Sequence, residues 1–204
     1  MPFEPAVVVS ASSLERAQPA TVDAGAIARA VTSILTAIGE DPGRTGLRET
    51  PHRVAESYAE LFSGYGVDPV SVLEPLPGEH GEGLIMVRAI DVVSFCEHHL
   101  LPFTGTASVA YLPSGPITGL SKLARVVDVL AHRLQVQERL VREIADALEA
   151  ALSPRGVFVL VEAEHLCMSI RGARKPGSVT VTTDARGELD DPATRAELLA
   201  LARG

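Results

Sequence analysis

The sequence has no long apolar run and no excess of positive charge, and each of these absences excludes a class of protein. No apolar run approaches the ~20 residues that a membrane-spanning helix requires. The formal net charge is −8, whereas a general nucleic-acid binder shows a basic face and a high isoelectric point. The short apolar segment 6–9 lacks the basic flank and the length of a signal peptide. We therefore expect a cytoplasmic globular protein that binds neither membranes nor nucleic acids.

The chain has only two cysteines, and each lies close to a histidine. Cys96 begins the run Cys-Glu-His-His, and Cys167 lies in the run His-Leu-Cys-Met. A thiol and an imidazole three positions apart, with a turn of the chain between them, can both reach one ion. Zinc suits such a mixed set of sulfur and nitrogen ligands. Cys96, His99 and Cys167 are therefore predicted to bind zinc.

The residues alone leave other interpretations open. The cysteines could form a disulfide, although nothing in the chain looks secreted and reduced thiols are the default. They could also be ordinary buried side chains. Structural zinc takes four protein ligands, whereas catalytic zinc keeps one position for water. His165 could supply a fourth ligand, because its i, i+2 relation to Cys167 would place both on one face of a strand, and a non-catalytic oligomeric protein with a closed Cys2His2 site is the alternative.

The apolar periodicity divides the chain into a helical N-terminal part and an α+β part. One helical pattern begins at Thr21 and ends at Gly39, a plausible C′ residue. A second begins at Thr50, predicted as the N-cap, with Pro51 at the first helical position. The loop-rich segment 69–83 is the predicted boundary between the two parts. We expect a loosely ordered arm at 1–20, a helical region with a linker at 21–80, and a catalytic domain at 81–204.

The second part follows the order strand, strand, helix, helix, strand, strand. This order is typical of an antiparallel four-stranded sheet with two helices on one face. A short helix from about Pro192 is expected to follow. The predicted strands are 84–95, 104–112, 157–164 and 178–185, and the apolar helical patterns run over 123–130 and 140–152.

A basic cluster stands between the predicted strands. Ser121 is predicted to cap a helix whose first turn carries Lys122 and Arg125, and cations beside a helix N-terminus favour phosphate. Each such cation, Arg171 included, is in isolation more typical of a solvated surface. Glu138 opens the next helix, where its two carboxylate oxygens could accept from two adjacent donors of guanine or simply favour the helix start.

Several of these segments together resemble the GTP cyclohydrolase I family, zinc enzymes of the tunnelling-fold group. The resemblance runs from about Gly39 to Leu201. The segments that carry it are 39–42, 50–54, 96–103, 119–125, 135–139, 165–168 and 171–172.

The resemblance implies that Cys96, His99 and Cys167 bind Zn2+ and leave its fourth position to water. His98 and His165 are then acid/base residues, because protons must move as the ring opens. In the family, water adds to C8 of the guanine ring of GTP and C8 leaves as formate. Rearrangement then gives 7,8-dihydroneopterin triphosphate. This reaction is the first step of tetrahydrofolate or pterin biosynthesis.

The resemblance also implies substrate contacts and an assembly. Glu138 binds the guanine edge, Gln137 helps to place the substrate, and Ser121, counted with His98 and His165 among the catalytic residues, lies near the ribose. The family assembles as a toroidal homodecamer with active sites between subunits, so we expect a homo-oligomer. The cations that meet the triphosphate are Lys122, Arg125 and Arg171, and Arg53 comes from a neighbouring subunit.

Two positions depart from the family pattern. Thr45 stands where an acidic residue commonly follows Arg44, and Ser108 stands where a histidine is common. Neither residue is assigned to chemistry, so these departures bear on local contacts or on preference among purine nucleotides. Nitrile reductases and pterin synthases of the same fold group lack the combined segments, which favours the cyclohydrolase interpretation.

Overall fold

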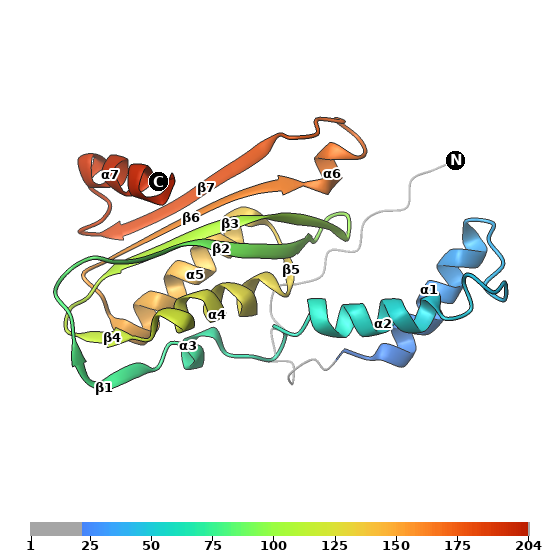
Figure 1. Ribbon diagram of the computed structural model, residues 1–204, viewed down its shortest axis with the longest axis horizontal. Coiled ribbons are helices and arrows are strands. Elements are labelled where there is room, and N and C mark those ends of the chain that lie inside the picture. The colour runs from blue at the N-terminus through green and yellow to red at the C-terminus, as the bar shows by residue number, and fades with distance from the viewer. Residues whose placement is uncertain (1–21, 204) are drawn as a thin grey trace, which may run out of the picture.

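The computed structural model describes residues 22–203 as a mixed α+β fold built on one main sheet (Figure 1). The predicted arm at 1–20 lies outside the described residues. The strand order in the sheet is β5-β2-β3-β6-β7. Its strands are β2 (Ile85–Cys96), β3 (Leu101–Leu112), β5 (Leu134–Gln135), β6 (Gly156–His165) and β7 (Val179–Gly187).

The four long strands pair antiparallel, as predicted. The fifth strand, β5, pairs parallel to β2 through only two residues. Two residues carry no readable period, so the sequence pattern did not indicate β5. The predicted antiparallel α+β fold is confirmed, with this short strand added at one edge.

Two amphipathic helices cover one face of the sheet, as predicted (Figure 1). They are α4 (Leu120–Ala131) and α5 (Gln137–Leu152), and their apolar stripes pack against the strands. The C-terminal helix α7 (Pro192–Arg203) packs against the opposite face through Leu198. Because both faces are covered, β6 is buried on both sides: Val159 faces α4 and α5, and Phe158 faces α7. Burial on both faces explains why this strand reads as a continuous apolar run.

The N-terminal helices α1 (Ala24–Ala37) and α2 (Thr50–Leu61) form a hairpin that projects beyond one end of the sheet (Figure 1). Gly39 has a φ of +91° after the end of α1, as expected of a C′ residue. The predicted N-cap of α2 is wrong by one position, because Thr50 is already helical and Glu49 precedes it. Phe62 joins the hairpin to the sheet, with its ring centroid 5.2 Å from that of Phe95.

The segment expected to be a loop-rich linker contains regular structure. It forms the short helix α3 (Pro69–Val72) and the strand β1 (Pro75–His80), which pairs with β4 (Pro116–Thr118). Asp68 caps α3 by accepting a hydrogen bond from the Val70 amide at 3.0 Å. Leu73 is fully buried in the core beneath α4 and α5, so this segment packs against the α+β part.

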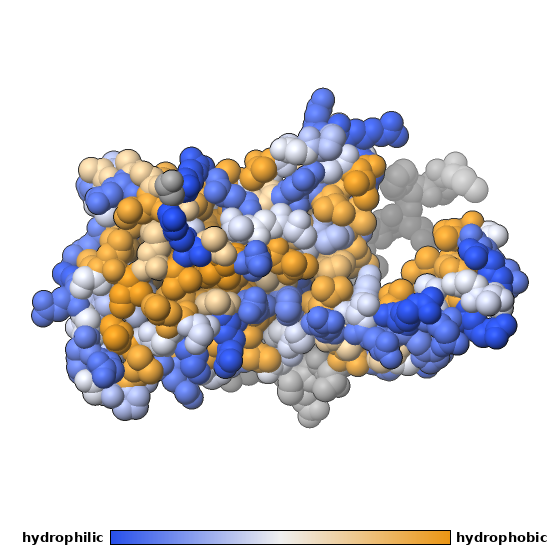
Figure 2. Space-filling view, in the orientation of Figure 1, coloured by the Kyte–Doolittle hydropathy of each residue, from blue (hydrophilic) through white to orange (hydrophobic). Residues whose placement is uncertain are grey.

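Hydrophobic residues also remain on the surface of the described chain. Figure 2 shows them gathered over the strands in the body of the molecule, whereas hydrophilic residues cover the lower side of the α1–α2 hairpin. On the edge strand β7, Val179 and Val181 are 57% and 45% exposed. None of the helices within 22–203 is long and apolar enough to cross a membrane.

Candidate metal centre

The turn between β2 and β3 places two of the predicted metal ligands next to each other. Cys96 is the last residue of β2, and β3 resumes at Leu101, opposite Cys96 in the antiparallel register. The Cys96 carbonyl accepts hydrogen bonds from the amides of His99 and Leu100 at 3.3 and 2.9 Å. Leu100 has a φ of +52°, which lets the chain reverse within this short turn. The imidazole of His99 is thereby directed back toward the Cys96 thiol.

The third predicted ligand, Cys167, lies just beyond the end of β6. His165 lies opposite Phe103 near the start of β3, so the end of β6 is beside the β2–β3 turn. The chain then enters the one-turn helix α6 (Leu166–Ser169), which carries Cys167. The prediction that His165 and Cys167 share one face of a strand is therefore wrong, because the strand ends between them.

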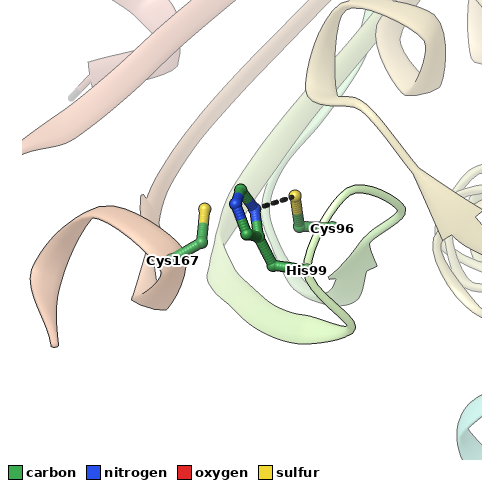
Figure 3. A group of neighbouring side chains, drawn as sticks. All are labelled: Cys96, His99 and Cys167. Carbon is green, nitrogen blue, oxygen red and sulfur yellow. Dashed lines mark hydrogen bonds between the residues drawn. The ribbon is translucent and has the colours of Figure 1, made fainter. Parts of the chain in front are cut away.

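The three predicted donors form one group (Figure 3). One ligand atom from each of Cys96, His99 and Cys167 lies within 4.8 Å of the others. The Cys96 Sγ and His99 Nδ1 atoms are 3.7 Å apart, close to the ~3.6 Å that tetrahedral zinc bond lengths require. Burial raises the pKa of the Cys167 thiol, and the neighbouring Cys96 thiol raises it further. Two thiolates so close to each other need a cation between them, so the donor chemistry fits a bound metal.

His165 is not a member of this group, because its ring is engaged elsewhere. The ring stacks on Phe103 with centroids 4.5 Å apart and an interplanar angle of 12°. Its Nε2 atom lies 2.7 Å from Oε1 of Gln137. Burial lowers the pKa of His165, and the nearby Glu138 carboxylate opposes that shift. These contacts favour a site with three protein ligands over the closed Cys2His2 alternative.

His98 lies at the exposed side of the metal centre. Its Nδ1 atom is 3.9 Å from Sγ of Cys96, and its side chain is 64% exposed. Neighbouring Glu97 forms an ion pair with Arg139 of α5, and that hydrogen bond holds the pKa of the Glu97 carboxyl below its usual range. His98 therefore borders the donors while keeping its ring accessible to a substrate.

The start of α5 lies at the same end of the sheet. Gln137 is buried, and all its polar atoms contact protein: Nε2 donates to backbone carbonyls and to Thr182, and Oε1 meets His165. Glu138, the next residue, is exposed in the single chain. Arg171 follows α6, and its charge lowers the pKa of Cys167 slightly. Gln137, Glu138 and Arg171 thus border the metal centre.

The start of α4 lies at the opposite end of the sheet. The Thr118 amide donates to the buried Tyr111 hydroxyl at 3.1 Å, so the chain enters α4 beside the far end of β3. Leu101 to Tyr111 is ten residue steps of strand, or about 33 Å. The structure therefore separates the metal centre from Ser121 and Lys122 within one chain (Figure 1). Arg125 follows one turn further along α4.

The structure also places two further predicted site residues, Ser121 and Arg53. Gly119, not Ser121, occupies the N-cap position of α4, because the helix begins two residues earlier than predicted. Arg53 lies on α2, where its guanidinium donates to Thr50 Oγ1 at 3.0 Å. Its helix belongs to the hairpin that projects beyond the end of the sheet (Figure 1).

Sequence reasoning missed two residues that shape the site. Arg139 and Phe103 hold Glu97 and His165 in place, but neither was assigned a role. Gln135 lies on β5 and Arg139 in the first turn of α5, so no helical spacing pointed to the hydrogen bond between them.

An antiparallel sheet backed by two helices, with a Cys2His group that could hold a metal ion at the end of its central strands, defines an α+β protein with a candidate metal site. The sequence profile of the family described as GTP cyclohydrolase I matches residues 27–203. The chain belongs to the GTP cyclohydrolase I family. All the curated relatives described below carry the name GTP cyclohydrolase 1.

These relatives cover most of this chain. The protein of Streptomyces avermitilis is 56% identical over 174 residues, which are 84% of this chain and 87% of that protein. The protein of Thermobifida fusca is 53% identical over 189 residues, 91% of each chain. The protein of Halalkalibacterium halodurans is 52% identical over 185 residues, 90% of this chain and 98% of that protein.

Proposed function

We propose that this chain hydrolyses GTP at C8 of the guanine ring, releases formate and forms 7,8-dihydroneopterin triphosphate. The observation that carries the proposal is the group of Cys96, His99 and Cys167 in a chain of this family. Zinc is the metal that two thiols and one imidazole favour. When bound, zinc supplies Lewis acidity that makes water a nucleophile near neutral pH.

The residues around the donors suit the proton transfers of this reaction. His98 is exposed beside the donors and can exchange a proton with the substrate or with water. His165 is held by Phe103 and Gln137, so its ring keeps one orientation while a proton is transferred. Glu138 is exposed next to Gln137 and can accept hydrogen bonds from the two adjacent donors of guanine.

We propose that each active site is completed by a second copy of the chain. Ser121 and Lys122 start α4 at the far end of the sheet, so one chain cannot bring them to its own donors. The sheet also has open edges: within residues 22–203, β7 pairs only with β6, and the outer edge of β2 is paired only at Phe95 and Cys96. Open strand edges favour pairing between chains, in line with a homodecamer. The catalytic domain at 81–204 and the cytoplasmic location stay predictions.

The proposed reaction can be tested with the full chain loaded with Zn2+. Incubation with GTP should release formate, and oxidation of the product should give pterin fluorescence. A protein that binds zinc as an oligomer but releases no formate from GTP would contradict the enzyme and support the closed, non-catalytic alternative.

The triphosphate contact is tested by Lys122→Ala and Arg125→Ala. Each replacement should raise the KM for GTP about ten- to a hundredfold, because a charged hydrogen bond contributes ~1.5–3 kcal/mol. Zinc content should not change, because α4 begins far from the donors. Unchanged kinetics in both variants would remove this helix start from the site.

Mixed assemblies test whether the site is shared between chains. Cys167→Ala lacks a donor and Lys122→Ala lacks a phosphate contact, so each protein alone should be nearly inactive at low GTP concentration. Co-expression should restore activity at about one site in four, because that fraction combines an intact donor group with an intact neighbouring α4. Absence of recovery in a verified mixed oligomer would place both residues in the site of one chain.

A further inference from the structure

Arg139 connects the turn that carries two metal ligands to the start of α5. Its Nη2 atom donates to the Glu97 carboxylate and to the Leu134 carbonyl, the latter at 2.8 Å. Its Nε atom donates to Oε1 of Gln135 at 2.9 Å. One planar guanidinium therefore holds three acceptors, and one of them, Glu97, follows the donor Cys96 directly.

The turn needs external support to keep its shape. Leu100 has a φ of +52°, a conformation that residues with a Cβ atom disfavour and that surrounding contacts must hold. The Glu97 amide donates to the Gln135 carbonyl at 3.0 Å, so the turn already meets the segment that Arg139 holds. Gln135 is itself fixed, because it is buried and its Nε2 atom donates to Leu130 and Glu143. Support for the turn therefore comes from Gln135 and Arg139 together.

We propose that Arg139 is a positioning residue for the metal centre. Through Glu97 and Gln135 it holds the turn so that Cys96 and His99 converge with Cys167. The kinetic consequences of this inference rest on the proposed function. The effect of Arg139 on metal binding follows from the structure of the turn alone. Arg139 is not one of the donors, so its effect on them passes through Glu97 and Gln135.

The competing account treats Glu97 and Arg139 as an ordinary surface ion pair. Such pairs contribute little to stability, and most replacements of them have small effects. Two features distinguish this pair: its side chains are only 34% and 30% exposed, and the guanidinium meets two further acceptors. A lysine could keep the charge but could not reproduce this planar geometry.

The test measures the affinity of the full-length protein for Zn2+ by competition with a chelator. Arg139→Gln, Arg139→Lys and Glu97→Gln should each weaken zinc binding about ten- to a hundredfold, the usual effect of losing a residue that orients metal ligands. The double replacement Glu97→Gln with Arg139→Gln should weaken it no further, because the two residues act as a unit. With zinc saturating, the KM for GTP should stay at the parental value.

Arg142→Gln is the matched control, because Arg142 is an exposed arginine one turn away on the same helix. It should bind zinc like the parent. The inference is overturned if Arg139→Gln and Glu97→Gln lower only the melting temperature while zinc affinity stays parental, or if their losses add. The affinity comparison uses no GTP, so it judges Arg139 even if the parent chain fails to release formate.

Discussion

Cys167→Ala is expected to abolish zinc binding and GTP turnover while the chain stays folded. Removing a ligand should cost more than the ~100-fold in metal affinity that residues supporting a ligand can cost, and it leaves only Cys96 and His99. The side chain is half-buried on a one-turn helix outside the main sheet, so its loss should disturb the core little. Metal analysis and formate release on one preparation measure both effects.

The neighbouring residue provides the control for this prediction. Met168 lies on the same helix and is 40% exposed, and a thioether is not among the usual zinc ligands. Met168→Ala should therefore keep the parental zinc content. Full zinc retention in Cys167→Ala would show that Cys167 is not a ligand and would reopen the choice of donors.

His98→Ala is expected to lower turnover about 10²–10⁴-fold, the usual contribution of general acid–base catalysis. Zinc content and oligomer size should stay parental, because His98 is largely exposed and is outside the donor group. Zinc content, size by chromatography and formate release should be measured on the same sample. These three measurements separate a catalytic role from a structural one.

His80→Ala is a suitable control, because this histidine is exposed on β1 and belongs to none of the proposed catalytic, substrate-binding or metal-binding residues. It should turn over GTP like the parent. Near-parental formate release from an intact His98→Ala protein would remove His98 from the mechanism and leave His165 as the acid/base candidate. Loss of zinc from the same variant would instead make His98 part of the donor set.

The main elements of the fold were predictable because their apolar periods are strong. The apolar stripes of α4 and α5 predicted the helices, and apolar, β-branched runs predicted the strands, with alternation only in β7. The order of these elements along the chain predicted the layers. Short elements were not predictable: β5 has two residues, and α3 and α6 have four each. Elements of this length are too short for a period to be read, and their conformation depends on tertiary contacts such as the burial of Leu73.

The donor group was predictable from spacing, but the surroundings of the donors were not. Cys96 and His99 are close in the chain, so one turn can bring them together. Cys167 joins them because it follows a strand that pairs beside that turn. The stacking of His165 on Phe103 depends on the register of β3 and β6, which no local pattern gives. The prediction that His165 and Cys167 share one face of a strand was wrong because the sequence pattern did not show that β6 ends at His165.

If each active site is completed by a second chain, as proposed, the distance between the two ends of the sheet should make catalysis depend on protein concentration. A chain that dissociates from its neighbours keeps Cys96, His99 and Cys167 together, so it should still bind its metal. It loses the α4 start of the adjacent copy, so it should lose productive binding of GTP. By mass action, dilution should therefore remove turnover before it removes the metal or unfolds the chain, and a monomer would be a metal-binding protein without being an enzyme.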